Sequence, residues 1–164
     1  MERRNAWLSY TEAEEELEKV AKEYRNFLDV GKTERECVTQ IIKEAQEAGY
    51  ECLEEKAAKG EKLKAGDKVY TAGMKKIVAL FHIGQDDIAE GMNILGAHID
   101  SPRLDIKQNP LYEDTDFAYL DTHYYGGVKK YQWVTIPLAI HGVVAKKDGS
   151  VVQVNIGEDE NDPI

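Results

Sequence analysis

The spacing of apolar residues changes near Gly49, and this change limits the possible folds more than any other feature of the sequence. Before Gly49, apolar side chains recur every three or four residues, which is the period of an amphipathic helix. After it, apolar residues come in short runs or alternate with polar ones, which is typical of β-strands. Helices followed by several strands favour a layered α/β or α+β domain.

The helical part divides into two predicted helices. The second is expected to begin at Thr33, because Glu36 stands three residues further on, at the spacing of a capping box. Gly31 and Gly49 are expected to end the first and second helix, since glycine often follows a helix C-terminus. The first helix has its apolar face at Leu17, Val20, Ala21, Tyr24, Phe27 and Leu28.

Three apolar segments in the middle of the chain are predicted to be strands. The last of them is apolar except for two residues, a pattern typical of a strand buried on both faces of a sheet. The lysine-rich residues 56–76 are interpreted as a solvated hairpin edge. The three predicted strands are Tyr50–Leu53, Lys76–Ile83 and Met92–Ile99.

The composition changes again after Lys107. Gln108–Tyr125 is rich in turn-forming and aromatic residues, and two predicted strands follow, Gln132–Lys147 and Ser150–Gly157. Asp148-Gly149 lies between these strands and is a strong hairpin signal. The residues after Lys107 are therefore expected to form a β-rich unit that differs from the first part of the chain.

Charge and the lack of sorting signals narrow the classes of function. The chain has 21 Lys and Arg against 31 Asp and Glu, a net charge of −10, whereas a protein that binds nucleic-acid backbones needs a basic face. The same acidity argues against an anionic membrane surface as a partner. The longest apolar run, Ile77–Phe81, is far shorter than the ~20 residues that span a bilayer, and the first residues lack a signal peptide. Cys37 and Cys52 make no disulfide framework, so a cytoplasmic location is expected.

The clearest chemical motif is Gly96-Ala97-His98-Ile99-Asp100-Ser101-Pro102. His98 ends a predicted strand, and Asp100 lies two residues further on, on the same side of an extended chain. A carboxylate in this position can hold one ring nitrogen of the histidine, which fixes the tautomer and leaves the other nitrogen for a metal. Strand ends are also where α/β sheets bind their ligands.

The same motif also fits a structural histidine, because His-x-Asp is a common tripeptide. One histidine cannot hold zinc, since a catalytic zinc site has three protein ligands or more. His82 and His141 lie in predicted strands, where a structural role is favoured, and His123 lies in a predicted loop. The chain has no His-Glu-x-x-His, Cys-x-x-Cys, P-loop or Gly-x-Ser-x-Gly pattern that would complete a site.

Residues 93–107 resemble the strand and loop that carry the first zinc ligand in the aspartyl aminopeptidase / vacuolar aminopeptidase I family of zinc metallopeptidases. They read Asn-Ile-Leu-Gly-Ala-His-Ile-Asp-Ser-Pro-Arg-Leu-Asp-Ile-Lys. The strand before them, the two N-terminal helices, and Tyr124-Tyr125-Gly126-Gly127 with Trp133 also follow in the family's order. The resemblance covers essentially the whole chain.

The resemblance implies a two-zinc aminopeptidase that removes N-terminal residues from peptides. It makes His98 a zinc ligand and Asp100 the carboxylate that orients this histidine. It also implies that residues 1–107 are the N-terminal part of an α/β catalytic domain, and that residues 108–164 begin an inserted β-rich domain that serves dimerisation and forms a lid. Family members assemble into tetrahedral dodecamers, so a homo-oligomer is expected.

The chain differs from the family pattern in two respects. The family's bridging Asp, base Glu and remaining ligands lie further downstream, so these residues are interpreted as the N-terminal portion of a longer enzyme and are expected to be inactive alone. Where aspartyl aminopeptidases read Trp-x-Asp-Arg-Asp-Leu, this chain has Trp133–Leu138 without acidic residues, which suits a divergent bacterial-type branch. Two alternatives stay open, a non-catalytic binding or assembly module and another two-metal amide hydrolase.

Overall fold

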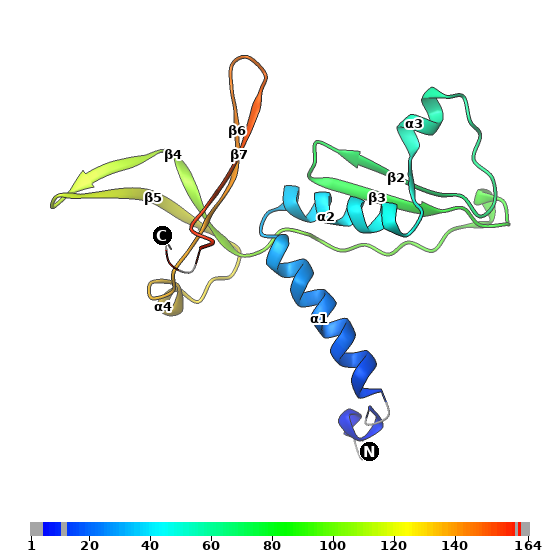
Figure 1. The fold of residues 1–164 in the computed structure, drawn as a ribbon, viewed down its shortest axis with the longest axis horizontal. Coiled ribbons are helices and arrows are strands. Elements are labelled where there is room, and N and C mark those ends of the chain that lie inside the picture. Colours follow the sequence, from blue (N-terminus) through cyan, green and yellow to red (C-terminus); the bar gives the residue numbers. More distant parts are fainter. Residues whose placement is uncertain (1–4, 11–12, 160, 162–164) are drawn as a thin grey trace. The chain divides into compact units, whose positions relative to one another are not determined.

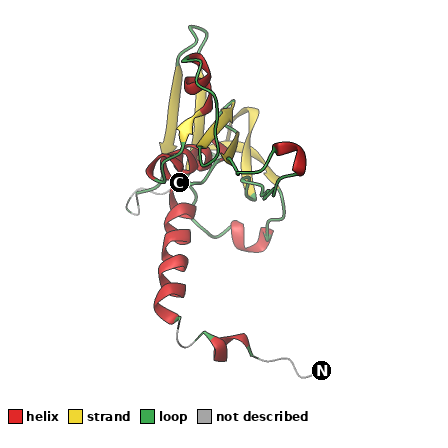
Figure 2. Cartoon of the chain, turned by 90° about the vertical axis from the view of Figure 1, so that its right-hand side faces the viewer, coloured by secondary structure: helices red, strands yellow, loops and turns green. Residues whose placement is uncertain are grey.

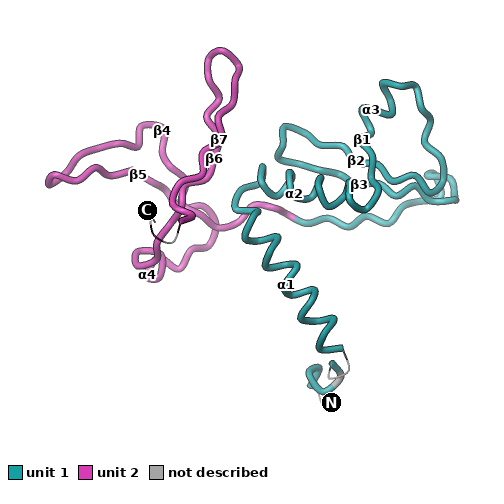
Figure 3. The backbone as a smooth tube through the Cα atoms, in the orientation of Figure 1, with its two compact units in different colours: residues 1–97 teal, residues 98–164 magenta. Residues whose placement is uncertain are grey.

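The computed structural model describes residues 5–10, 13–159 and 161. The chain forms two compact units, Met1–Ala97 and His98–Ile164 (Figure 3). The predicted domain division after Lys107 stays a prediction. Among the described residues, no helix is both long enough and apolar enough to cross a membrane.

Both predicted helices are present in the first unit, as α1 (Glu14–Val30) and α2 (Glu34–Glu47) (Figure 1, Figure 2). Thr33 begins α2 through the predicted capping box. Its Oγ1 accepts a hydrogen bond from the Glu36 backbone N–H at 3.3 Å, and Glu36 Oε2 accepts one from the Thr33 N–H at 2.9 Å. These two bonds satisfy backbone donors that a helix start otherwise leaves unpaired. A short 3₁₀ helix, η1 (Ala6–Ser9), precedes α1.

The sheet of the first unit contains three strands, β1 (Glu51–Cys52), β2 (Lys68–Gly73) and β3 (Ile77–His82). Their order is β1-β2-β3, with β1 parallel and β3 antiparallel to β2. A short helix, α3 (Leu53–Ala58), occupies the start of the lysine-rich segment for which a hairpin edge was predicted. Among the described residues of this unit, the buried side chains come from α2 and β2, and they are Cys37, Val38, Ala45, Val69 and Tyr70.

The prediction of a strand at Met92–Ile99 is wrong, because the structure shows no regular secondary structure in these residues. After a 3₁₀ turn, η2 (Ile88–Glu90), these residues pair with no strand in the described part of the chain. Ile94 is 80% exposed and Leu95 fully exposed. A strand forms only where a neighbouring strand accepts and donates its backbone hydrogen bonds. An apolar pattern indicates that a segment is suited to burial, but it does not indicate which segment pairs with it.

The second unit opens with a long hairpin formed by β4 (Arg103–Asp114) and β5 (Phe117–Tyr125) (Figure 1). The turn-forming residues of this segment had predicted turns here instead of two strands. The two residues of the connecting turn, Thr115 and Asp116, have φ of +50° and +66°. Two left-handed residues match the twist of a hairpin, but without glycine they give little sequence signal.

Pro110 lies inside β4, where the pairing with β5 is interrupted. The register pairs Ile106 with Thr122 and resumes at Leu111 with Leu120. Proline cannot donate a ladder hydrogen bond, so within strands it is confined to edges and to irregular positions such as this one. Residues 107–110 of β4 therefore lie opposite the single residue Asp121 of β5, as in an extended β-bulge.

The second hairpin, β6 (Ile140–Ala145) with β7 (Val151–Ile156), confirms the Asp148-Gly149 hairpin prediction. Gly149 has φ of +83°, a conformation that glycine adopts without a steric penalty. Asp148 Oδ1 accepts hydrogen bonds from the Ser150 backbone N–H at 2.9 Å and from its hydroxyl at 2.7 Å.

The strand predicted to start at Gln132 begins only at Ile140. The residues before it form a short helix, α4 (Lys130–Trp133). The Thr135 N–H donates to the Gln132 carbonyl at 3.1 Å, which extends this turn, and Pro137 has no N–H to offer a neighbouring strand.

Candidate functional site

His98 and Asp100 are in contact at the start of the second unit. The His98 Nδ1 lies 2.9 Å from the Asp100 carbonyl oxygen and 3.2 Å from Asp100 Oδ1. Because both partners are acceptors, Nδ1 carries the proton in this arrangement. All polar contacts of this imidazole with described residues involve Nδ1, and the side chain is 83% exposed. Nε2 is therefore the ring nitrogen suited to bind a metal.

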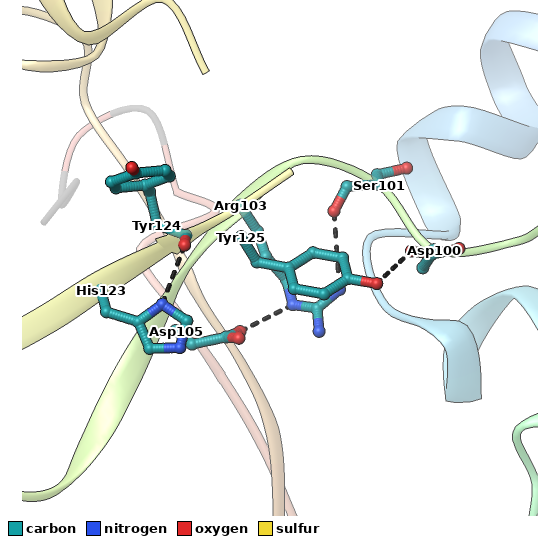
Figure 4. Close-up of polar contacts among 7 residues, drawn as sticks. All are labelled: Asp100, Ser101, Arg103, Asp105, His123, Tyr124 and Tyr125. Atoms are coloured by element: carbon teal, nitrogen blue, oxygen red, sulfur yellow. Dashed lines mark hydrogen bonds and ion pairs between the residues drawn. The ribbon is translucent and has the colours of Figure 1, made fainter. Parts of the chain in front are cut away.

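Tyr125, the last residue of β5, holds the other oxygen of the same carboxylate. Its hydroxyl donates a hydrogen bond to Asp100 Oδ2 at 2.6 Å (Figure 4). This bond is the main cause that lowers the pKa of Asp100 below its ordinary value; desolvation opposes it, and His98 lowers the pKa further. Asp100 is therefore ionised at neutral pH, which is the form that attracts a histidine N–H.

Arg103 supports the Tyr125 ring. It is the first residue of β4 and pairs with Tyr125 in the hairpin register. Its guanidinium carbon lies 4.2 Å from the centre of the Tyr125 ring, and its Nε donates to Asp105 Oδ1 at 2.7 Å (Figure 4). The planar guanidinium is thus held at its edge by a carboxylate while one face covers an aromatic ring.

The turn after Tyr125 packs closely against the segment that follows Asp100. Gly126 has φ of +74°, and a Cβ added there would lie 3.2 Å from the Pro102 Cα. Only glycine combines this conformation with so close an approach. The backbone after Tyr125 is therefore held near the backbone after Asp100, in keeping with the short hydrogen bond between the two side chains.

His123 and His141 have other polar partners than His98 has. His123, in β5, has its Nδ1 2.8 Å from the Tyr124 carbonyl oxygen (Figure 4). It also lines an open surface pocket with residues 105–109 of β4, where the pairing of β4 with β5 is interrupted. His141 Nε2 lies 2.6 Å from Glu158 Oε1, and its side chain is 10% exposed. His82 lies in β3 of the first unit.

The residues present supply part of what a zinc site requires. His98 is exposed and has its Nδ1 engaged by Asp100, as a single imidazole ligand does. Among the described residues, no group of three or more His, Cys, Asp or Glu side chains is placed to hold a metal ion. These residues thus fit one ligand of a zinc site and the carboxylate that orients it.

No role was predicted for Tyr125 or Arg103 from the sequence. Tyr125 lies 25 residues after Asp100, and only the pairing of β4 with β5 brings them together. The available signal was an aromatic residue directly before a Gly-Gly turn, which by itself suggests no function.

Residues 27–164 match the model of a protein family described as aminopeptidase I zinc metalloprotease (M18). A probable M18 family aminopeptidase 1 from Clostridium acetobutylicum is 57% identical over 164 residues, covering 99% of this chain and 35% of the relative. A protein of the same description from Thermotoga maritima is 44% identical, covering 100% of this chain and 35% of the relative. The chain thus spans about a third of the length of these relatives.

Solved structures show the same fold and confirm the expected α/β class. The crystal structure of aminopeptidase I from Borrelia burgdorferi has a TM-score of 0.88 at 40% identity, covering 98% of this chain and 39% of that one. Aminopeptidase I from Clostridium acetobutylicum has a TM-score of 0.81 at 57% identity, covering 99% of this chain and 36% of that one. Family match, sequence identity and fold agree with the resemblance carried by residues 93–107, and the chain belongs to the M18 family of aminopeptidase I zinc metalloproteases.

Proposed function

We propose that the full-length protein carrying this chain is a zinc-dependent aminopeptidase that hydrolyses N-terminal residues from peptides with a metal-activated water. The family supports this reaction class. The observation that carries the site assignment is the contact between Asp100 and the His98 Nδ1. His98 would supply one zinc ligand through Nε2, and the other ligands and the general base would come from outside these 164 residues, so that this chain alone is inactive.

Each of the two residues has a separate task in this proposal. When bound, zinc polarises the scissile carbonyl and lowers the pKa of a coordinated water. Asp100 keeps the proton of His98 on Nδ1, so that the lone pair of Nε2 stays available, and it prevents the exposed ring from rotating. A carboxylate at Nδ1 also strengthens Nε2 as an electron-pair donor.

We propose further that the enzyme is a cytoplasmic homo-oligomer, with a dodecamer and a two-zinc site as the family resemblance implies. The two free cysteines, Cys37 and Cys52, support a reducing compartment. The segment Trp133–Leu138 departs from the charged stretch of aspartyl aminopeptidases, so the proposal includes no preference for acidic N-terminal residues.

The reaction class is tested by the hydrolysis of a peptide with a free N-terminus and of its N-acetylated counterpart by the full-length protein. The free peptide should be cleaved and the acetylated one spared, with activity lost to a chelator and restored by zinc. Equal cleavage of both peptides would exclude an aminopeptidase.

His98→Ala tests the site within the same assay. The variant should lose activity about 100-fold or more while its circular dichroism stays unchanged, because a metal contributes several kcal/mol to the transition state. His123→Ala is the matched control, since it removes an exposed histidine of β5 whose Nδ1 contacts the Tyr124 carbonyl oxygen and not Asp100, and it should keep its activity. Wild-type turnover of His98→Ala would refute the assignment.

A further inference from the structure

The two oxygens of the Asp100 carboxylate are divided between two partners. Oδ1 faces the His98 Nδ1 at 3.2 Å, and Oδ2 accepts the Tyr125 hydroxyl at 2.6 Å. The second distance is typical of a hydroxyl that donates to an ionised carboxylate, a bond about twice as strong as one between neutral groups. A carboxylate held at one oxygen cannot rotate freely, so the oxygen that faces His98 is fixed as well.

Tyr125 is itself held by neighbours on both the backbone and the ring. Arg103 covers its ring at 4.2 Å, and the backbone pairs with Arg103 across the hairpin. The Gly126 turn brings the following backbone close to Pro102. We call the end of the hairpin at the Arg103–Tyr125 pair the hairpin base. The packing of this base fixes the position of the Tyr125 hydroxyl next to Asp100.

The neighbouring Tyr124 provides a contrast. Its ring lies 4.2 Å from the Lys130 ammonium, and its carbonyl oxygen contacts His123. Successive strand residues point to opposite faces, so the side chains of the two tyrosines contact different residues. Tyr124 thus shares the residue type, strand and exposure of Tyr125 without its contact to the Asp100 carboxylate.

We infer that Tyr125 is a positioning residue of the metal site: its hydroxyl fixes the Asp100 carboxylate, which in turn fixes the imidazole of His98. This inference rests on the proposed role of His98 as a zinc ligand. Through Tyr125 and Asp100, the base of the β4–β5 hairpin sets the orientation of the His98 imidazole. A disturbance of the hairpin base would then reach the metal without touching His98 or Asp100.

The test measures zinc dissociation constants of the full-length protein by competition with a chromophoric chelator. Tyr125→Phe removes only the hydroxyl and keeps the ring under Arg103. It should raise the zinc Kd about tenfold, within the 10–100-fold range typical of partners behind a metal ligand. Tyr124→Phe, the matched control, should leave the Kd unchanged, and thermal melting of the zinc-free proteins should show the same midpoint for both variants.

A double-mutant cycle separates positioning from a general structural role. Asp100→Ala removes the carboxylate through which Tyr125 acts, so Tyr125→Phe should add no further loss of zinc affinity in the Asp100→Ala background. Additive losses would overturn the inference, because they would show that Tyr125 acts independently of Asp100. An unchanged Kd in Tyr125→Phe would overturn it too.

His98→Ala distinguishes failure of this inference from failure of the proposed function. If His98→Ala weakens zinc binding and Tyr125→Phe does not, the ligand role stands and the positioning role is refuted. If His98→Ala leaves every zinc dissociation constant unchanged, the proposed function fails, and the inference fails with it.

Discussion

The guanidinium of Arg103 covers the ring of Tyr125 at 4.2 Å, across a register pair of β4 and β5. The Arg103 Nε also donates a hydrogen bond to Asp105 Oδ1 at 2.7 Å, and this bond fixes the plane of the guanidinium above the ring. A cation above an aromatic face contributes about 0.5–1 kcal/mol at an exposed site. This contact links the stability of the hairpin base to the residue that holds Asp100.

Replacing Arg103 by Met should lower the thermal midpoint and weaken zinc binding together. The substitution removes about 0.5–1 kcal/mol of cation–aromatic attraction and leaves the Tyr125 ring less constrained. Lys130→Met removes the equivalent 4.2 Å contact with Tyr124 and should leave zinc affinity unchanged. Melting curves and chelator competition measure the two effects, and equal zinc affinities in the two variants would contradict this role of Arg103.

Gly126→Ala should destabilise the hairpin base by about 1–2 kcal/mol, because an L-residue is strained at φ of +74°. The new methyl group would also meet the Pro102 Cα at 3.2 Å. Gly127→Ala is the control, since a Cβ there meets nothing within 4 Å. Differential scanning calorimetry should show a lower midpoint for the first variant only, and a shared midpoint would argue against the strained turn.

Stability of the β6–β7 turn should depend on pH through Asp148. The Ser150 hydroxyl, and next its backbone N–H, lower the pKa of Asp148 below the ordinary value of 3.8. A group with a lower pKa in the folded state stabilises that state above its unfolded pKa, and this contribution is lost as the pH falls through the folded pKa. The loss is therefore confined to pH values below about 4.

Ser150→Ala should raise the pKa of Asp148 toward its ordinary value, because the hydroxyl is the largest cause of the shift. The carboxyl ¹³C chemical shift of Asp148, followed by NMR during an acid titration, reports this pKa directly. Ser101→Ala, which leaves the turn intact, serves as the control. Identical titration curves for wild type and Ser150→Ala would disprove the assigned cause.

The two cysteines should differ in reactivity toward alkylating agents. Cys37 is 5% exposed, and burial, followed by the charges of Glu36 and Glu34, raises the pKa of its thiol. Both effects lower the amount of accessible thiolate, the reactive form. Cys52 is only partly buried, so it should be modified about tenfold faster or more. Peptide mapping by mass spectrometry after timed iodoacetamide treatment measures the ratio, and earlier labelling of Cys37 would contradict the burial.

Elements with local signals could be predicted from the sequence. Thr33 and Glu36 specify the start of α2 through their own hydrogen bonds, and Asp148-Gly149 specifies the turn between β6 and β7. Met92–Ile99 could not be assigned correctly, because a strand also needs a neighbour and the apolar pattern carries no information about which segment pairs with it.

The candidate site also combines a local contact, which the sequence predicts, with a long-range contact, which it does not. His98 and Asp100 are two residues apart, so their contact follows from the local chain geometry. The contact between Asp100 and Tyr125 depends on the register of a hairpin whose turn, Thr115-Asp116, contains no glycine. That register could not be derived from residue types alone, and so the role of Tyr125 emerged only from the fold.

The ligand role of His98 is tested most directly by a crystal structure of the full-length, zinc-loaded protein, with diffraction data collected on both sides of the zinc absorption edge. An anomalous peak is predicted about 2.0–2.1 Å from the Nε2 of His98, with Nδ1 still facing Asp100. A zinc peak elsewhere with none within bonding distance of His98, or coordination through Nδ1, would contradict it.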